Sequence, residues 1–473
     1  MSPYAHKDAA TSGGTELDTY VPPRTLIRVG KTYLDHGGTT NPHSASTPSA
    51  VAGAKVDEVR LQALKFFRSD PEKFDLVFVS NASAAIKLVA ECFRDYRAPG
   101  EKTRGGFWYG YHRDVHTSMV GTRQLSKDQH HCFVNDDEVN QWINGTLKRK
   151  VGPKKGQVGL FGFPGQSNMT GRRLPYLLDA AALATACPID LSDEATAPDF
   201  MAVSFYKIFG FPNVGALIVR KEAGCVLKQR KYFGGGTVDM VITLDDTWHA
   251  KRQTSLHDQL EDGTLPFHSI FALGHAIEVH QRLFGSMSQI SAHTAFLAKR
   301  LHGGMSNLTH VNGVPVCRIY KDPEAIYGDA KTQGATVAFN VQDSSGMPIA
   351  YSDVEKLADE HNLYLRSGGL CNPGGIATFQ NFTAPDMKAI FTLGHRCSKP
   401  LTPEQLGGKM PGVVRVSLGA MSTISDVDIF LAFMADHYVE TYQSIRESPM
   451  GLAESDRLEL VHFGYCSVNQ LTR

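Results

Sequence analysis

One apolar run in this chain has a cation inside it: Phe200-Met201-Ala202-Val203-Ser204-Phe205-Tyr206-Lys207-Ile208-Phe209-Gly210-Phe211-Pro212. A second apolar run, Val214–Val219, follows almost at once. Lysine is almost never fully buried without a partner or a chemical task. Buried lysines that have a task often form Schiff bases, because desolvation favours the neutral, nucleophilic amine. Lys207 is therefore the first candidate for a catalytic residue.

An acidic residue lies in another apolar segment upstream, where Tyr176–Ala181 contains Asp179. In enzymes that use pyridoxal phosphate (PLP), a Lys holds the aldehyde and an Asp pairs with the pyridinium nitrogen, so Lys207 and Asp179 together indicate a PLP site. The alternative, for each residue alone, is a charged side chain at a strand end that reaches solvent. Further signals in the right order along the chain decide between these interpretations.

Length, charge and cysteine usage exclude several classes of protein. A chain of 473 residues is too long for one hydrophobic core and predicts two or three domains. The 48 basic and 48 acidic residues balance, so neither nucleic acid nor a membrane is expected as a partner, and no apolar stretch approaches the roughly 20 residues that span a bilayer. Met1–Asp8 lacks the apolar core of a secretion signal, and the 8 cysteines form no Cys-x-x-Cys pair. We therefore expect a cytoplasmic protein with reduced thiols and no metal site.

Apolar runs of strand length recur along the first half of the chain, with helical patterns between several of them. This alternation predicts an α/β domain with a mostly parallel, seven-stranded sheet. The expected strands are Asp75–Ser80, Gly106–Tyr111, His131–Asn135, Val158–Phe163, Tyr176–Ala181, Met201–Tyr206 and Val214–Val219, and the expected helices are Ser49–Arg68 and Ala82–Tyr96.

The texture changes after about residue 306, which predicts a smaller α+β domain. Its expected elements are strands Thr336–Val341, Leu363–Arg366 and Val413–Leu418 and helices Ser352–Asn362 and Ser425 to about Tyr442. The expected organisation is a flexible tail at 1–22, a large PLP-binding domain at 23–305, of which 23–45 could pack on the small domain, a small α+β domain at 306–445, and a tail of unassigned role at 446–473.

Polar residues follow several of the expected strands. Ala82 and Ser83 open a helix after the first strand, where backbone amides and the helix dipole suit a phosphate, although an ordinary helix cap is the alternative. His116 could stack on an aromatic ring, or be a loop residue, and Asn168 looks like a turn residue. All of them fall at carboxyl ends of expected parallel strands, which is the edge where open α/β sheets bind ligands.

Ordered motifs along most of the chain resemble the cysteine desulfurase branch of fold-type I PLP enzymes, the class V aminotransferase family. Within it, the resemblance is closer to the N-terminal domain of molybdenum cofactor sulfurases. The most specific pieces are Asn41-Pro42-His43-Ser44, Ser204-Phe205-Tyr206-Lys207-Ile208-Phe209-Gly210, Tyr232-Phe233-Gly234-Gly235-Gly236-Thr237, Glu261-Asp262-Gly263-Thr264, Gly394-His395-Arg396-Cys397 and Arg415-Val416-Ser417-Leu418-Gly419.

The resemblance implies a role for each candidate at the cofactor ring. Lys207 would bind the aldehyde, and Asp179 would keep the pyridine nitrogen protonated so that the ring acts as an electron sink. His116 would stack on the ring, and Asn168 would hydrogen-bond its phenolic oxygen. The polar residue often found three positions after the aspartate in this family is Ala182 here, so one contact to the cofactor oxygen is expected to be missing.

The resemblance also implies how the phosphate is held. Ser83 and Ser204 would bind it together with the helix start at Ala82. Thr264 would reach it from the other subunit of a homodimer.

Sulfur chemistry needs a thiolate near the substrate sulfur, and the Gly-rich stretch 365–375 has the texture of a loop that could carry one on Cys371. A buried structural cysteine is the common alternative, but flanking glycines and Arg366 favour an exposed, activated thiol. In the family pattern the catalytic cysteine lies five residues after an arginine, as Cys371 does after Arg366. Arg415 and Arg366 are the candidates for binding a substrate carboxylate, with surface salt bridges as the alternative.

The expected activity is that of a cysteine desulfurase, in which L-cysteine passes its sulfur to Cys371 as a persulfide and leaves as alanine. Alternatives are a PLP lyase, decarboxylase or aminotransferase acting on another amino acid, or a non-catalytic homologue. Full-length sulfurases carry a further C-terminal molybdopterin-binding domain that this sequence lacks, so the sulfur acceptor, molybdenum cofactor or a dedicated acceptor, stays open.

Two connections are shorter than the family pattern. Thr40 is followed directly by Asn41 where relatives have a helix, and residues 165–174 are too few for a parallel crossover with its helix, which takes about 10–12 residues. Either segments are missing from the sequence or the enzyme is a trimmed form.

Overall fold

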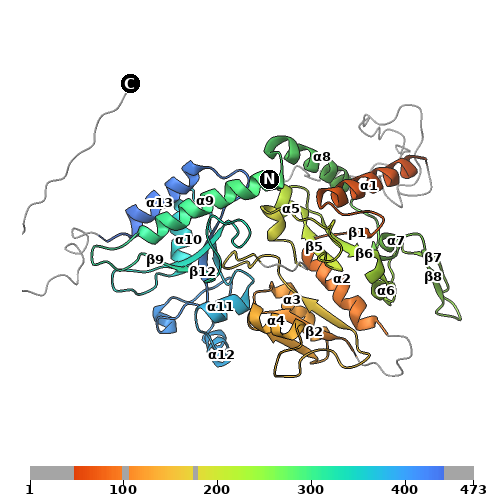
Figure 1. Cartoon of the computed structure of the whole chain (residues 1–473), viewed down its shortest axis with the longest axis horizontal. Helices are drawn as coiled ribbons and strands as arrows, with labels where there is room; N and C mark the ends of the chain where they lie inside the picture. Colours follow the sequence, from red (N-terminus) through yellow and green to blue (C-terminus); the bar gives the residue numbers. More distant parts are fainter. Residues whose placement is uncertain (1–46, 98–105, 174–178, 441–473) are drawn as a thin grey trace, which may run out of the picture. The chain divides into compact units, whose positions relative to one another are not determined.

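The computed structural model describes residues 47–97, 106–173 and 179–440 (Figure 1). The tails expected at 1–22 and 446–473, the segment 23–45 and the Thr40–Asn41 junction lie outside the described residues. Among the described residues no helix is both long and apolar enough to cross a membrane.

The sheet of the large domain is built from two sets of three strands. In one set β2 is parallel to both neighbours, in the order β3-β2-β4. In the other, β6 is antiparallel to both β1 and β5, in the order β1-β6-β5. The strands are β1 Phe74–Val79, β2 Trp108–His112, β3 His130–Phe133, β4 Gly159–Gly162, β5 Phe200–Ser204 and β6 Gly215–Arg220.

Asp179 joins the two sets. It forms parallel bridges to Pro164, just after β4, and to Ala202 of β5. Of the strand expected at Tyr176–Ala181, residues 176–178 lie outside the described residues, but Asp179 occupies the place of a fifth strand in a mostly parallel sheet. The expectation of a mostly parallel sheet is confirmed. β6 runs antiparallel because only the short helix α5, Phe205–Phe209, and a turn separate it from β5, whereas a parallel return needs a long crossover.

The described part of the short connection, residues 165–173, contains no helix. These residues form turns and two isolated bridges, Gln166 to Arg173 and Arg172 to Gln333. The expected loss of the crossover helix therefore holds for these residues.

Both faces of the sheet are covered, and alternate strand residues show it. In β1, Leu76 and Phe78 belong to one buried cluster and Val77 to another. The first cluster contains residues from α1 and α8, and the second contains residues from α2. Side chains of successive strand residues point to opposite faces, so a strand buried on both reads as an unbroken apolar run.

The helices around this sheet agree with the two expected from the sequence and add several more. The α-helices are α1 Thr47–Phe66, α2 Ala82–Asp95, α3 Thr117–Thr122, α4 Asp136–Ile143, α5 Phe205–Phe209, α6 Gly224–Leu227, α7 Leu256–Leu260, α8 Phe267–Phe284 and α9 Met287–Asn307, with a hairpin of β7 Val238–Val241 and β8 His249–Lys251. Short 3₁₀ turns occur at η1 Arg123–Leu125, η2 Leu183–Thr185, η3 Lys221–Ala223 and η4 Glu404–Leu406.

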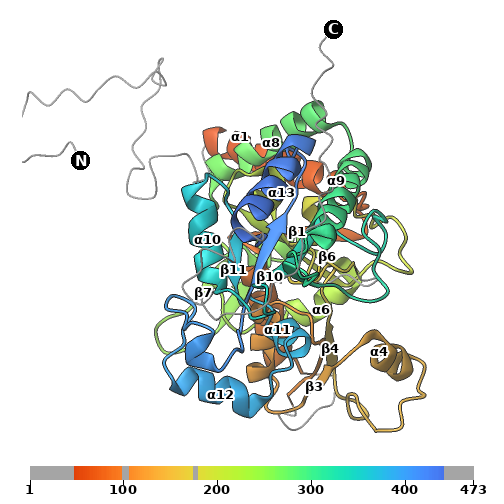
Figure 2. The same cartoon turned by 90° about the vertical axis from the view of Figure 1, so that its left-hand side faces the viewer.

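The small domain is an antiparallel sheet in the order β11-β12-β10-β9, accompanied by helices α10 to α13 (Figure 2). Its elements are β9 Cys317–Tyr320, β10 Thr336–Val341, α10 Tyr351–Glu360, β11 Arg366–Gly368, α11 Pro373–Phe379, α12 Ala384–Thr392, β12 Val413–Ser417 and α13 Ile424–Tyr438.

Most expectations for the small domain are confirmed, but the strand expected at Leu363–Arg366 is wrong. The strand is Arg366–Gly368, because β11 is defined by its pairing with β12 and not by the apolar residues before it. Leu297, Leu301 and Met305 of α9 are buried with the small-domain residues, so this helix spans the expected boundary at residue 305, and that boundary stays a prediction.

Candidate active site

Two adjoining cavities lie beside the sheet and the turn that contains Leu370 and Cys371, here called the cysteine turn. The smaller has a volume of about 100 Å³ and the larger about 500 Å³. The side chains that line both are His116, Gln166, Asn168, Ala182, Tyr206 and Lys207. The smaller cavity also reaches Asp179, and the larger also reaches Cys371, so the structure brings together candidates that lie far apart in the sequence.

Lys207 is not inside a strand, and its side chain is not buried. β5 ends at Ser204, and the chain turns directly into α5, which carries Lys207 and is closed by Gly210 at φ 75°. The lysine is exposed and lines both cavities. The argument from burial is therefore wrong for this residue, and its position at the carboxyl end of a buried strand is what places the amine in the site.

Asp179 is fixed by its backbone. Its amide donates to the Phe163 carbonyl at 3.1 Å, and its carbonyl accepts from the Gly165 amide at 2.9 Å. The carboxylate oxygen Oδ1 accepts from the Ala181 amide at 3.1 Å. The backbone of Asp179 is thus bonded to the segment after β4, and it also bridges to Ala202 of β5. Its carboxylate lines the smaller cavity together with Lys207.

The start of α2 forms another wall of the smaller cavity. Asn81 caps this 14-residue helix with its side chain. The Oγ of Ser204, a residue only 2% exposed, accepts from the Ala82 amide at 3.0 Å. Ser83 Oγ lies 2.8 Å from Ser118 Oγ. Hydroxyls and a helix N-terminus thus surround one end of the cavity, which is the environment that suits a phosphate.

His116 caps α3 and presents a neutral ring. Its Nδ1 accepts from the Ser118 amide at 3.1 Å and lies 2.5 Å from Ser118 Oγ. Because an amide can only donate, Nδ1 carries no proton, and the proton of the neutral ring is on Nε2. Burial lowers the pKa of His116, Asp179 opposes this, and Lys207 adds to it.

The larger cavity contains the two arginines and the thiol that the sequence singled out. Arg366 and Arg415 are directly opposite each other in the β11–β12 pairing. Arg415 Nη1 donates to the backbone oxygen of Asn168 at 2.9 Å. Burial lowers the pKa of Arg415, the neighbouring Arg366 adds to this, and Cys371 opposes it. Two guanidinium groups beside a thiol are chemically suited to a carboxylate, and their role in substrate binding stays a prediction.

Cys371 is exposed, as expected, and lies in the short connection between β11 and α11, within the stretch where a loop was expected. It sits in a tight turn with Leu370, both at positive φ, 52° and 53°, directly before α11. The Cys371 carbonyl accepts from the Thr117 amide at 3.0 Å, which ties the turn to the helix that follows His116.

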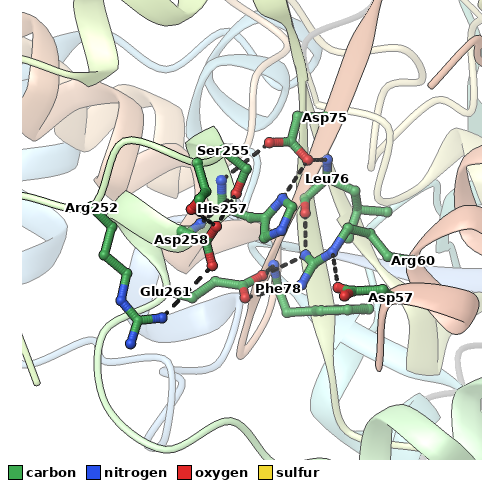
Figure 3. A network of polar contacts seen from close by, with 11 residues as sticks. Asp57, Arg60, Asp75, Leu76, Phe78, Arg252, Ser255, His257, Asp258 and Glu261 are labelled. Carbon is green, nitrogen blue, oxygen red and sulfur yellow. Dashed lines mark hydrogen bonds and ion pairs between the residues drawn. The ribbon is translucent and has the colours of Figure 1, made fainter. Parts of the chain in front are cut away.

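Thr264 is the one expected site residue that lines neither of these cavities in the part of the chain that the structure describes. Thr264 is exposed. It lies three residues after Glu261, which belongs to a polar network shown in Figure 3. There Glu261 accepts two hydrogen bonds from Arg60, at 2.7 and 3.1 Å, and one from the Phe78 amide at 2.7 Å. Its role in a partner's site stays a prediction.

Sequence reasoning missed Gln166, Ser118 and Tyr206, which also line the smaller cavity. Each lies within two residues of a recognised candidate: Gln166 before Asn168, Ser118 after His116, and Tyr206 before Lys207. Proximity in the sequence was the only signal for them. Ala182 lines both cavities, so the position where relatives often have a polar residue does face the site.

The residues present fit PLP. An amine, a carboxylate between two strands, a neutral imidazole and a hydroxyl-rich helix start surround one cavity, and these are the groups that would hold its aldehyde, ring nitrogen, ring face and phosphate. The roles of the individual residues stay predictions.

Known proteins are similar to this chain in sequence and in fold. A model of the family "Aminotransferase class-V" matches residues 172–430. The molybdenum cofactor sulfurase of Aspergillus niger is 50% identical over 445 residues, covering 86% of this chain and 52% of the relative. That of Emericella nidulans is 48% identical over 448 residues, with the same two shares. The chain spans about half the length of the curated relatives it matches.

Solved structures agree at lower identity. The apo structure of a cysteine desulfurase from Thermococcus onnurineus has a TM-score of 0.59 at 20% identity, covering 83% of this chain and 86% of that one. The cystine C–S lyase C-DES, solved with its reaction product cysteine persulfide, has a TM-score of 0.57 at 15% identity, covering 85% and 92%. At such identities the likeness shows the fold, which is fold type I of PLP-dependent enzymes, as the sequence predicted. With the match over residues 172–430, these findings show that the chain belongs to the class V aminotransferase family.

Proposed function

We propose that this chain is a PLP-dependent cysteine desulfurase. The observation that carries the proposal is the shared cavity of about 500 Å³, which brings Lys207, Cys371 and Arg415 together although they lie on three different elements. Relatives of about half identity are named molybdenum cofactor sulfurases, which supports sulfur transfer as the reaction class.

The residues divide the reaction between them. PLP, when bound, supplies an electron sink for the bond changes at Cα and Cβ of the substrate. Arg415 and Arg366 would bind the carboxylate of L-cysteine, and Lys207 would take the proton from Cα. Asp179 would keep the pyridine nitrogen protonated. The neutral His116 would cover the ring face, and Asn168 would bind the phenolic oxygen.

Cys371 would accept the sulfur. Its thiolate forms an S–S bond to the substrate sulfur as the substrate C–S bond breaks, and protonation of the carbon skeleton gives alanine. The balance is one protein thiol plus L-cysteine giving one protein persulfide plus L-alanine, with no other oxidant or reductant. The exposure of Cys371 supports this role, because an attacking thiolate must reach the substrate.

The test is sulfur loading on one thiol. After incubation with PLP and L-cysteine, mass spectrometry is expected to find a single sulfur added to the peptide containing Cys371, with alanine released. Cys371→Ala should still change its visible spectrum when L-cysteine binds, but should release almost no alanine. Cys397→Ala is the matched control, since Cys397 is also an exposed thiol, and it should behave as wild type. Sulfur added to Cys397, or alanine release that survives in Cys371→Ala, contradicts the assignment.

A C–S lyase on the same fold is the second candidate, because C-DES has a comparable TM-score. A lyase would release its sulfur product into solution and would need no protein thiol. Sulfide or persulfide release by Cys371→Ala at the wild-type rate would therefore favour this alternative. A protein that binds no PLP and changes no amino acid would instead be a non-catalytic homologue.

From the name of the relatives, molybdenum cofactor is proposed as the final sulfur acceptor, with a dedicated acceptor as the alternative. Persulfide-loaded protein mixed with desulfo molybdenum cofactor should lose its extra sulfur if the first is right. The described cysteines are all free thiols, which suits the reducing cytoplasm, and cell fractionation tests that location.

A homodimer is proposed to complete the phosphate site through Thr264. Thr264 is exposed and lines neither cavity of its own chain among the described residues. The segment 232–251, which contains the β7–β8 hairpin, accepts a hydrogen bond from the Gly263 amide at the Gly235 carbonyl, at 2.8 Å, and exposes large apolar side chains. They are Tyr232, Met240, Leu244 and Trp248. Light scattering should give twice the monomer mass, and Thr264→Ala should weaken PLP binding without dissociating the dimer.

A further inference from the structure

We infer that Asn372 is a positioning residue. Through a hydrogen bond to Ser167, it fixes the position of the Cys371 thiol relative to the turn that carries Asn168, here called the cofactor-binding turn. This inference rests on the proposed role of Cys371 and adds a residue to it.

The turn that presents the thiol is strained. Leu370 and Cys371 are consecutive residues with φ of 52° and 53°, a left-handed conformation that residues with a Cβ rarely adopt. Such a backbone is unfavourable for residues with a Cβ, so the turn persists only where its surroundings fix it. Leu370 supplies one anchor: it is 4% exposed and packs with Met169 and Val413 in an apolar cluster.

Asn372 supplies the polar anchor. It is fully buried, at 0% exposure. Its side-chain Oδ1 accepts from the Gly375 amide at 2.9 Å and caps α11, and its backbone amide donates to the Gly369 carbonyl at 3.0 Å. Its Nδ2 donates to Ser167 Oγ at 3.3 Å. One side chain therefore does two separable tasks: Oδ1 caps a helix, and Nδ2 reaches across to another segment.

Ser167 connects this bond to the cofactor-binding turn. It is also fully buried, and its Oγ accepts from the Met169 and Thr170 amides, both at 3.3 Å. The residue enclosed by these bonds is Asn168, which lines both cavities and whose carbonyl binds Arg415. The hydroxyl of Ser167 thus orders the Asn168 turn and receives the Asn372 amide at the same time.

Besides this bond and the packing of Leu370 with Met169, two backbone contacts link the cysteine turn to the large domain. Thr117 donates to the Cys371 carbonyl, and a Cβ on Gly374 would lie 2.1 Å from the Arg113 carbonyl oxygen. These contacts hold the turn close to the Arg113 and Thr117 backbone. The Asn372–Ser167 bond fixes the side that faces Asn168, and it can be removed without removing the cap.

Asn372→Ser is the variant that separates the two tasks. Serine is as good a helix cap as asparagine, but its hydroxyl is too short to cap α11 and reach Ser167 together. We expect sulfur loading of Cys371 to fall about 10- to 100-fold, because misplacing a reacting group by about 1 Å can cost 100-fold. The spectral change on L-cysteine binding should be retained, since Lys207 and Arg415 are untouched.

The control for helix capping is Asn135→Ser, at an exposed position. Asn135 caps α4 by accepting from the Glu138 amide at 2.8 Å, and it lines neither cavity. Both variants are compared as full-length protein with PLP, by single-turnover sulfur loading, by Tm, and by the rate at which iodoacetamide alkylates Cys371 without substrate. Asn372→Ser should change both the loading and the alkylation rates, and Asn135→Ser should change neither.

Wild-type loading and alkylation rates in Asn372→Ser overturn the inference, and so does an equal loss in both Asn→Ser variants. If Asn372→Ser does not fold, Ser167→Ala tests the same bond from the acceptor side, with the same expected loss and the same refuting result. Failure of the proposed function is distinguishable: Cys371→Ala would then keep releasing alanine, whatever Asn372 does.

Discussion

The pair of Arg60 and Glu261 at the centre of the network in Figure 3 offers the sharpest prediction on stability. Their side chains are 5% and 7% exposed, and two hydrogen bonds join them. Arg60→Met keeps the apolar stem of the side chain but removes the charge, leaving Glu261 buried with the Phe78 amide as a remaining donor. Breaking a buried ion pair from one side costs about 3–5 kcal/mol, so we expect a loss of that size in the free energy of unfolding.

Two comparisons isolate the cause. In Arg60→Met combined with Glu261→Gln no buried charge of this pair is left, and Asp57, the other partner of Arg60, is exposed, so most of the stability should return. Arg300 makes an equally close two-bond pair with Asp428, at 2.8 and 2.9 Å, but both side chains are about half exposed. Arg300→Met should therefore change the urea midpoint little, because exposed pairs are screened by water.

The pH dependence provides a second check. Burial raises the pKa of Glu261 above its ordinary value of 4.5, and Arg60 opposes this rise, so removing Arg60 raises the pKa further. Between 4.5 and the raised value the folded protein binds more protons than the unfolded chain, and its stability falls as the pH rises. The loss caused by Arg60→Met should be larger at about pH 8 than at about pH 5. Urea unfolding that gives equal losses for Arg60→Met and Arg300→Met, or no recovery in the double variant, would refute this reasoning.

Two further predictions concern the cofactor. Purified protein reconstituted with PLP should be yellow, and Lys207→Ala should lose the absorbance of the lysine-bound cofactor; a colourless wild type that takes up no PLP would exclude the class. Asp179→Asn should still bind PLP, measured by fluorescence titration, but lose turnover by about 100-fold or more, since a neutral amide does not hold the pyridine nitrogen protonated; a near-normal rate in this variant would contradict the role of Asp179.

The sheet could be predicted because its strands are buried on both faces. Runs such as Val214–Val219 have no polar face, and the structure shows why: Ile218 belongs to one core cluster and its neighbours Leu217 and Val219 to the other. The same property hid the direction of β6, because an apolar run does not reveal which way its strand runs. The length of the connection was the available signal, since five helical residues and a short turn cannot make a parallel crossover.

The structure of the Lys207 segment was harder to predict, because a short apolar run is compatible with either a strand or a helix. The run from Phe200 to Phe209 is apolar except for Ser204 and Lys207, yet the chain changes from strand to helix at Ser204. Sequence reasoning assigned Lys207 to the site because it expected a buried lysine inside a strand, whereas the lysine is exposed and lies in α5. A lysine inside β5 would be buried in one of the core clusters, whereas a lysine one turn beyond its carboxyl end lines both cavities.

The contacts that set the position of the thiol had no counterpart in the sequence pattern. Gly368 and Gly369 suggested an unusual backbone near Cys371, but the strained residues are Leu370 and Cys371 themselves, and neither residue type favours positive φ. Asn372 and its partner Ser167 are 205 residues apart, and each alone resembles an ordinary turn or cap residue. Side-chain chemistry therefore indicated which groups meet in the site, while their distances depend on buried hydrogen bonds between distant segments. For that reason a conservative change at Asn372, which touches no substrate, is the variant most able to separate the position of the thiol from its presence.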